Sequence, residues 1–382
     1  MKTKYKVLYF YPFGPFFPIA SGSDIVAANQ LEFFRKKNAC VDLLIYYRDE
    51  KQSQLKQFKN KYSWCNSITE LQAPGHAWKF GEFLCVADYV TKIEPLKSML
   101  NQEYDLVFNN YCLTAPIALA AKKAKLKVLE TVDHVYKSFA KKSENDSEQN
   151  CDLSFYQKIE FDLYKVFNKI IFINREELES TPKINGLEFK WIPPAWPFAT
   201  PEIKHHNSQY IDILFLGSAH KPNIDGIDFF YNEVFLPHLR KKGIKLTVVG
   251  KVCNLWPVED PSVKKLGFYS GEISEIYQSA KIVIIPILEG TGVSIKTMEA
   301  FAFGKAIVST PLGTRGMKLD GNPLISIDMK KNPLDFANAI VELLDSPEKR
   351  ENLGNCAFQQ FQKEHSFEVY YKRMEDFLEL AS

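Results

Sequence analysis

The stretch Ile284–Gly316, IIPILEGTGVSIKTMEAFAFGKAIVSTPLGTRG, decides the fold of this 382-residue chain. The run Lys281–Pro286 is apolar and β-branched, which is typical of a parallel strand buried on both faces. Beyond the glycines, Ser294–Phe303 spaces its apolar residues as a helix does, and Gly304 can end that helix in a left-handed conformation. Ala306–Ser309 then predicts the next strand, so the stretch reads as a βαβ unit.

The loop Gly290–Gly292 joins the first of these strands to the helix. A loop in that position exposes backbone N–H groups beside the positive end of the helix dipole, which suits phosphate or sugar hydroxyls. Glu299 lies inside the helix, where its carboxylate can accept two hydrogen bonds from a ribose diol. An ordinary βαβ unit with a tight turn would explain the same pattern without any ligand.

These residues resemble the donor-site motif of family 4 of the retaining, nucleotide-sugar-dependent glycosyltransferases. The similar subgroup has the pattern G-T-G-x-x-x-K-x-x-E-A-x-A-x-G, followed shortly by V-S-T. The positions that match are Gly290, Thr291, Gly292, Lys296, Glu299, Ala300, Ala302, Gly304, Val308, Ser309 and Thr310. The resemblance implies an α/β chain with the GT-B fold, in which two doubly wound Rossmann-like domains face each other across a cleft.

The chain departs from the larger family at one position. That family has two glutamates with seven residues between them, and counting back from Glu299 gives Thr291 where the first acid is expected. Glu289 stands two residues too early. Either Glu289 reaches the donor sugar through a lengthened loop, or Thr291 and backbone amides replace the acid, and the subgroup pattern favours the second alternative.

Strand and helix patterns alternate through the first half of the chain, which predicts a doubly wound parallel sheet. The proline-rich segment Trp191–Pro201 reads as a linker, after which the alternation restarts. We therefore expect an N-terminal acceptor-side domain over 1–194 and a C-terminal donor-binding domain over 195–365. The resemblance implies that the last helix, at about 366–382, returns to the first domain.

The expected elements have these bounds. Strands are predicted at Lys6–Tyr11, Val41–Tyr46, Leu106–Asn109, Lys127–Thr131, Lys169–Ile173, Ile211–Leu216 and Lys245–Val249. Helices are predicted at Ile25–Lys37, Ala115–Ala124, Tyr156–Phe167, Asp225–Leu239, Ile273–Gln278, Leu334–Leu344, Pro347–Lys363 and Phe367–Leu380. Residues 48–100 read as irregular or helical, and the polar segment 141–152 reads as a mobile loop.

Composition and charge exclude several classes of protein. Apolar residues make up 46% and charged residues 25%, as in a soluble globular protein. A net charge of +2 does not suggest a nucleic-acid partner. No run of 18 apolar residues predicts a membrane-spanning helix. The seven cysteines are scattered and odd in number, which favours reduced thiols in a cytoplasmic protein over disulfides or a zinc site.

The resemblance also carries roles onto individual residues. Gly292, Val293 and Ser294 would present backbone groups to the sugar, and Lys296 would stabilise charge on the departing diphosphate. In the segment Ile213–Phe230, the loop after the strand would face that diphosphate. Its expected contributions are the backbone N–H groups of Gly217 and Ser218 and the cation of Lys221, although a solvated lysine explains Lys221 equally well.

Two groups in the first half complete the expected site. Gly22 and Ser23 lie in the first β–α loop, which faces the cleft in similar enzymes, although Gly22 also suits a plain turn. Asp133 and His134 end a predicted strand, where ligands bind in parallel sheets. The family has a His or His-Asp pair near this position that contacts donor sugar, so we expect Asp133 and His134 to take part in catalysis, with a structural histidine as the alternative.

The resemblance implies a metal-independent enzyme with no cofactor, which uses a nucleoside-diphosphate sugar as donor and a glycan or lipid-linked acceptor. The setting it implies is cell-surface polysaccharide, lipopolysaccharide or glycoconjugate assembly. Residues 1–199 carry 27 Lys and Arg against 23 Asp and Glu. This mild excess suits peripheral contact with the inner face of a membrane, and solvated lysines explain it equally well. The alternatives are a GT-B epimerase and a non-catalytic nucleotide-sugar-binding partner of another transferase.

Overall fold

The computed structural model describes residues 5–19, 21–47, 49–72, 91, 92, 94, 96–137, 153–196, 210–269 and 273–380. The chain divides into two compact units. Unit 1 comprises Met1–Pro194 and Tyr371–Ser382, and unit 2 comprises Ala195–Tyr370. The boundary falls in the proline-rich linker, between the same two residues as the expected domain boundary. The expected mobile loop at 141–152 lies outside the described residues.

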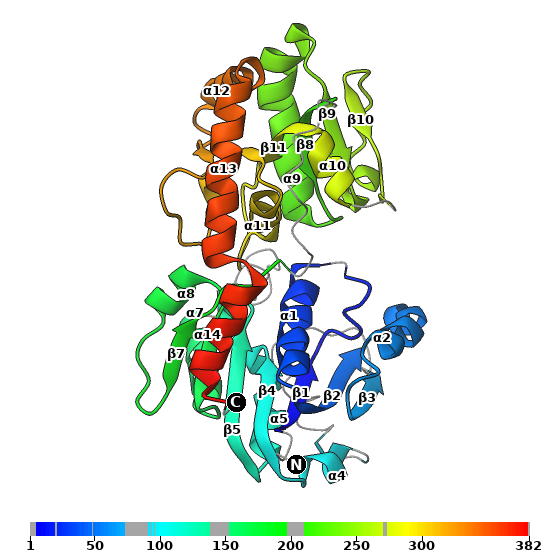
Figure 1. Cartoon of the computed structure of the whole chain (residues 1–382), viewed down its shortest axis with the longest axis vertical. Helices are drawn as coiled ribbons and strands as arrows, with labels where there is room; N and C mark the ends of the chain where they lie inside the picture. The colour runs from blue at the N-terminus through cyan, green and yellow to red at the C-terminus, as the bar shows by residue number, and fades with distance from the viewer. Residues whose placement is uncertain are drawn as a thin grey trace. The chain divides into compact units, whose positions relative to one another are not determined.

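Unit 1 is built on a parallel sheet of seven strands in the order β3-β2-β1-β4-β5-β6-β7 (Figure 1). The strands are β1 (Lys6–Tyr11), β2 (Cys40–Tyr47), β3 (Ser67–Gln72), β4 (Tyr104–Asn110), β5 (Ala124–Thr131), β6 (Lys169–Phe172) and β7 (Glu188–Trp191). The central strands β1 and β4 are buried along most of their length, as expected for a parallel sheet covered by helices. The strand order reverses direction between β1 and β4.

Short helices connect these strands. They are α1 (Gly22–Lys36), α2 (Leu55–Lys61), α4 (Leu96–Leu100), α5 (Ala115–Ala120), α7 (Leu153–Tyr164) and α8 (Arg175–Ser180), with 3₁₀ turns η1 (Asp49–Gln54) and η2 (Cys112–Thr114). The expected elements are present, with ends that differ by a few residues. The prediction for residues 48–100 was incomplete, because strand β3 lies within them, and β7 was missed as well.

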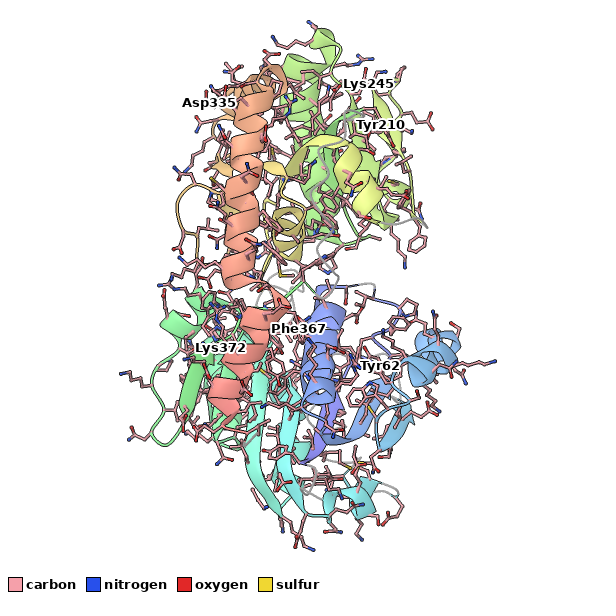
Figure 2. The ribbon with its side chains drawn as sticks, viewed as in Figure 1. Tyr62, Tyr210, Lys245, Asp335, Phe367 and Lys372 are labelled. Carbon is pink, nitrogen blue, oxygen red and sulfur yellow. The ribbon has the colours of Figure 1, made fainter. Side chains whose placement is uncertain are left out.

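The C-terminal helix α14 (Phe367–Leu378) begins in unit 2, and its residues from Tyr371 belong to unit 1. Figure 2 labels Phe367 near its start and Lys372 further along it. Within unit 1, the Tyr371 ring packs 5.1 Å from that of Phe33 on α1. Lys169 Nζ at the start of β6 bonds to Glu379 at 2.7 Å, just after the helix. These contacts attach the end of the chain to the N-terminal sheet.

Unit 2 contains a second parallel sheet, of six strands in the order β10-β9-β8-β11-β12-β13 (Figure 1). The strands are β8 (Ile211–Leu216), β9 (Leu246–Val249), β10 (Val263–Lys265), β11 (Ala280–Ile285), β12 (Ala306–Ser309) and β13 (Ile325–Ser326). The two edge strands were not predicted, because two or three residues of mixed polarity give no periodic signal. The strand order reverses direction between β8 and β11, which are neighbours in the sheet.

The helices of unit 2 are α9 (Lys221–Phe229), α10 (Ile273–Ser279), α11 (Ile295–Ala302), α12 (Pro333–Asp345) and α13 (Pro347–Glu364). Shorter turns are η4 (Arg240–Lys242), η5 (Lys251–Asn254) and η6 (Pro311–Thr314). Helix α9 continues as the π-helical segment η3 (Phe230–Leu239), which contains Pro237. The helix expected from residue 225 therefore begins four residues earlier, at Lys221. Among the described residues, no helix is long and apolar enough to cross a membrane.

Both predicted domains are thus doubly wound parallel α/β units, and the predicted fold class is correct. In such sheets, ligands bind outside the carboxyl ends of the strands at the point where the strand order reverses. In unit 2 this point lies between β8 and β11. The loops that follow these two strands contain Gly217 and the segment Gly290–Gly292.

Candidate active site

The glycine loop after β11 has the backbone geometry that its sequence suggests. Gly290 and Gly292 adopt φ values of 148° and 69°, which side-chain-bearing residues rarely take. Helix α11 begins directly afterwards and ends as predicted at Gly304, whose φ is 56°. The loop is therefore shaped by its glycines so that it delivers the chain to the N-terminus of α11 at the sheet edge.

Among the described residues, no side-chain cap is present at the N-terminus of α11. Ser294 occupies the cap position, but its hydroxyl lies 2.9 Å from Thr297 Oγ1 and caps no backbone N–H. Thr297 in turn donates to the Gly313 carbonyl oxygen. Since uncapped N–H groups at a helix N-terminus attract anions, this end of α11 suits a negatively charged ligand. Gly292, Val293 and Ser294 are all buried along the loop that leads to it.

Arg315 holds the glycine loop from the neighbouring segment, and the sequence reasoning missed it. Its Nε donates to the Thr291 carbonyl oxygen at 3.0 Å, and Nη1 donates to the Leu312 carbonyl oxygen at 2.8 Å. A Cβ atom at Gly290 would come within 3.0 Å of Nη2. The sequence did offer a signal for it. Loops that follow adjacent parallel strands lie at the same edge of a sheet, so a cation a few residues after β12 could be expected near the loop after β11.

Glu299 lies in the middle of α11 and is partly exposed. Burial raises the pKa of its carboxyl to about 7, and nearby Lys296 opposes that shift. The Tyr277 hydroxyl is buried and makes no hydrogen bond with the described residues, yet it lies close enough to Glu299 for the two groups to affect each other's pKa. Because Glu299 is partly exposed, its carboxylate can be reached by hydroxyl groups of a ligand.

Lys296 is connected to the loop after β8. Its Nζ donates to Asn223 Oδ1 at 2.7 Å, and Asn223 Nδ2 donates to the Ser218 carbonyl oxygen and to Ser218 Oγ, each at 3.0 Å. Burial lowers the pKa of Lys296 to about 8; the Glu299 carboxylate raises it and the Arg315 guanidinium lowers it further. Asn223 was not among the residues expected at the site.

Gly217 has a packing role instead of the predicted anion-binding role. Its N–H donates to the Val249 carbonyl oxygen at 2.9 Å, so the expectation that this N–H is offered to a diphosphate is wrong. The backbones also approach closely here: a Cβ at Gly250 would lie 2.3 Å from the Gly217 carbonyl oxygen. Ser218, the next residue, is exposed and remains a candidate.

Lys221 and Glu289 lie on the exposed side of this edge. Lys221 is in the first turn of α9 and forms an ion pair with Asp225, which raises the pKa of the lysine. The charge of Glu289 acts on Lys221 in the same direction. The Lys221 cation is therefore already partly neutralised, which makes it a weaker candidate for the diphosphate than Lys296. Thr291 is partly buried, so neither residue proposed for the first acid is excluded.

In unit 1, Gly22 and Ser23 form the first turn of α1. Ser21 caps this helix by accepting from the Asp24 N–H at 3.3 Å, and its hydroxyl lies 3.0 Å from Ser23 Oγ. The two residues follow β1, at the reversal of the first sheet, and both are partly exposed. They stay candidates for residues that contact the donor.

His134 is completely buried, which supports a structural role and not the expected catalytic one. Its Nε2 lies 3.0 Å from Thr181 Oγ1, and its ring lies 5.1 Å from that of Tyr136 and 6.0 Å from that of Phe172. Burial lowers its pKa to about 3, so the ring is neutral near pH 7. Asp133, beside it, is partly exposed and remains a candidate. Among the described residues, no cluster of three or more His, Cys, Asp or Glu side chains could hold a metal ion.

Comparison with known proteins agrees with this geometry. Residues 211–346, which contain the whole β8–β11 edge, match the family described as "Glycosyl transferases group 1". A 44.6 kDa protein in the cps region of Klebsiella pneumoniae is 26% identical over 333 residues, or 78% of this chain and 81% of that protein.

Solved structures resemble the chain over nearly its whole length. HepE of Anabaena, solved with UDP and glucose, has a TM-score of 0.66 at 12% identity over 99% of this chain and 100% of that one. Sucrose-phosphate synthase of Thermosynechococcus elongatus has a TM-score of 0.69 at 16% identity, over 98% of each chain. The family match in unit 2 and the fold of the two units together support a glycosyltransferase with the GT-B fold.

Proposed function

We propose that the protein is a retaining glycosyltransferase that moves a sugar from a nucleoside-diphosphate sugar to an acceptor hydroxyl. The observation that carries this proposal is the group of positively charged elements at the β8–β11 edge. Lys296, Arg315 and the uncapped N-terminus of α11 all belong to it, from the segments that follow β11 and β12. A diphosphate is the negatively charged part of such a donor, and the match to the group 1 family over these residues supports the same assignment.

The chemistry follows from the charge that develops during transfer. The bond between the anomeric carbon and the diphosphate oxygen breaks, and the electron pair stays on that oxygen. Lys296 and the N-terminus of α11 stabilise this negative charge as it forms, which is where electrostatic catalysis contributes most. Glu299 accepts hydrogen bonds from the ribose hydroxyls, and the backbone of Gly292, Val293 and Ser294 contacts the sugar. The acceptor oxygen bonds to the anomeric carbon with retention of configuration, and the acceptor's hydroxyl proton passes to the departing diphosphate oxygen.

The proposed mechanism does not require a metal ion. In enzymes that use one, a divalent cation neutralises the diphosphate; here the cations of Lys296 and Arg315 would serve this purpose. We expect transfer to survive chelation. Complete loss of transfer in EDTA, restored by Mn²⁺ or Mg²⁺, would overturn this part of the proposal.

The acceptor is proposed to be a glycan or a lipid-linked glycan in cell-surface polysaccharide, lipopolysaccharide or glycoconjugate assembly. The support is the relative in a cps region, a setting that suggests polysaccharide synthesis. A cytoplasmic protein that contacts the inner face of the membrane fits this role. The UDP bound by HepE, a protein of similar fold, makes uridine diphosphate sugars the first donors to test.

The test is a calorimetric screen against nucleoside diphosphates and their sugars, followed by incubation of each bound donor with candidate acceptors. Proton NMR of the product reports the anomeric configuration. Transfer with the donor's configuration supports the proposal, and an inverted product contradicts retention. Recovery of an epimerised donor would favour the epimerase alternative, and binding without turnover would favour the non-catalytic alternative.

A further inference from the structure

The Lys296 ammonium is held by a residue that lies 73 positions earlier in the chain. Asn223 belongs to the first turn of α9 and is only 4% exposed. Its carboxamide oxygen accepts from Lys296, and its carboxamide nitrogen donates to both oxygen atoms of Ser218. An ammonium can only donate, so these partners fix the orientation of the amide. The Asn223 side chain thus links Lys296 on helix α11 to Ser218 in the loop after β8.

We propose that Asn223 is a positioning residue for the donor diphosphate, which fixes the Lys296 ammonium and the Ser218 loop relative to each other without neutralising the lysine. This inference rests on the proposed function, because it concerns the same diphosphate. Asn223 itself need not touch the donor. It acts through Lys296, whose long side chain would otherwise lose several rotameric degrees of freedom when the ligand binds.

An amide suits this role better than a carboxylate for two reasons. Aspartate at position 223 would form an ion pair with Lys296 and reduce the positive charge that a diphosphate meets. It would also lose both donor bonds to Ser218 and set a carboxylate oxygen against the Ser218 carbonyl oxygen. Asparagine supplies an acceptor for the ammonium and donors for the loop, and it adds no charge.

The charged groups around Lys296 determine how each substitution acts on it. Glu299, on the same helix, favours the ammonium form, and Arg315, from the segment after η6, disfavours it. The hydrogen bond to Asn223 favours the ammonium form as well, because it is made to the charged state. Removing the acceptor should therefore lower the pKa of Lys296 below its present value of about 8, and a carboxylate in its place should raise it.

The experiment compares Asn223→Ala, Asn223→Asp and the wild-type protein. Calorimetry at pH values from below to above 8 measures the affinity for UDP, GDP and ADP, and lysine labelled with ¹³C at Cε allows the Lys296 amine to be titrated by NMR without ligand. Asn232→Asp is the matched control, because Asn232 is exposed on η3 and its amide donates to the Asp228 carbonyl oxygen on the same helical segment. Thermal unfolding of each variant verifies that it is folded.

We expect both Asn223 variants to bind the diphosphate about tenfold more weakly near pH 7, the effect of losing roughly one hydrogen bond to a charged group. The pH midpoint of the Lys296 titration should be lower than in the wild type for Asn223→Ala and higher for Asn223→Asp. The Asn232→Asp control should match the wild type. A merely structural residue would weaken binding equally at every pH and leave the midpoint in place.

Two results would contradict the proposal, and they are distinguishable. If the wild-type protein binds none of the three nucleoside diphosphates, the proposed function fails, and the role of Asn223 fails with it. If the wild-type protein binds one of them, and folded Asn223 variants keep its affinity and the Lys296 midpoint, the proposed function stands and only the role of Asn223 is wrong.

Discussion

The carboxyl ends of the two parallel sheets carry polar residues that behave in opposite ways. In unit 2, Lys296 and Glu299 lie at the reversal of strand order, remain partly exposed and bear groups whose pKa values lie near neutrality. In unit 1, His134 follows β5, one strand away from the reversal, and is fully buried. A polar residue at the end of a parallel strand is therefore a stronger candidate for ligand binding where the strand order reverses and the group keeps contact with solvent.

Buried carboxylates of unit 1 form hydrogen bonds with the turn that follows β5. Glu160 on α7 accepts from the Tyr136 N–H at 2.8 Å and from the Tyr164 hydroxyl at 2.7 Å. The Glu177 carboxylate faces the backbone N–H of His134. Glu160 and Glu177 thus hold the turn that follows β5 through hydrogen bonds to its backbone. Polar residues at a strand end can therefore serve the structure and need not mark a ligand site.

The largest effect is expected from the glycine loop of unit 2. Gly292→Val adds bulk at a φ of 69°, where a β-branched residue is strained, and it should reduce transfer by at least about 100-fold in a folded protein. Thr291→Ala removes one hydroxyl and should lower the rate only modestly. Transfer assays on both proteins test this.

Glu289→Gln is the control for the position of the missing acid. If this variant is inactive while Thr291→Ala is normal, the acid lies at Glu289, and the alignment of the loop to the glycosyltransferase motif is wrong by two residues.

The next effect concerns unit 1 and is one of stability. His134→Ala removes a fully buried ring and its contact with Thr181, and it should reduce the free energy of unfolding by about 2–4 kcal/mol. Affinity for nucleoside diphosphate should stay close to that of the wild type. Urea unfolding and calorimetry measure the two quantities, and wild-type stability combined with lost turnover would restore the catalytic role expected from the sequence.

Glu299→Gln should weaken nucleotide binding by about 1–3 kcal/mol, the range for hydrogen bonds to a charged group. The variant keeps the size of the side chain and loses the charged acceptor. Calorimetry with the free nucleoside diphosphate is the measurement. Unchanged affinity would show that Glu299 does not bind the ribose hydroxyls.

The smallest effect is a pH dependence of stability from unit 1. Burial raises the pKa of Glu130 to about 8, that of Glu160 to about 7 and that of Glu177 to about 8. A carboxyl whose pKa is raised by folding stabilises the protein fully below its unfolded pKa and loses that contribution as the pH rises through the folded value. Thermal stability should therefore decline between pH 5 and 8 through these groups.

Glu130→Gln tests this decline, since Glu130 is 1% exposed and one of its carboxyl oxygens has no hydrogen-bond partner among the described residues. The variant should have a shallower dependence of melting temperature on pH than the wild type. An identical dependence in both proteins would show that the Glu130 carboxyl does not titrate over this interval.

The sequence was informative where the signal is local. The strand, glycine loop and helix from 281 to 304 could be placed because their apolar periodicity and the glycines that end each element lie within one short stretch. Asn223 and Arg315 could not be assigned, because their partners at Lys296 and Thr291 lie 73 and 24 positions away, and only the sheet brings them together. The position of His134 at a strand end is likewise visible in the sequence, and its burial against α7 and the end of α8 is not.

The central claim is that the Lys296 cation of unit 2 binds the diphosphate of the donor. Calorimetry of nucleoside diphosphate binding to Lys296→Met at pH 7 tests it most directly, with Lys331→Met as the matched control, since Lys331 is 80% exposed and pairs only weakly with Asp328 at 3.3 Å. The account predicts at least about tenfold weaker binding for Lys296→Met and wild-type binding for the control. Equal affinity in Lys296→Met and the wild type, with both proteins folded, would contradict the account.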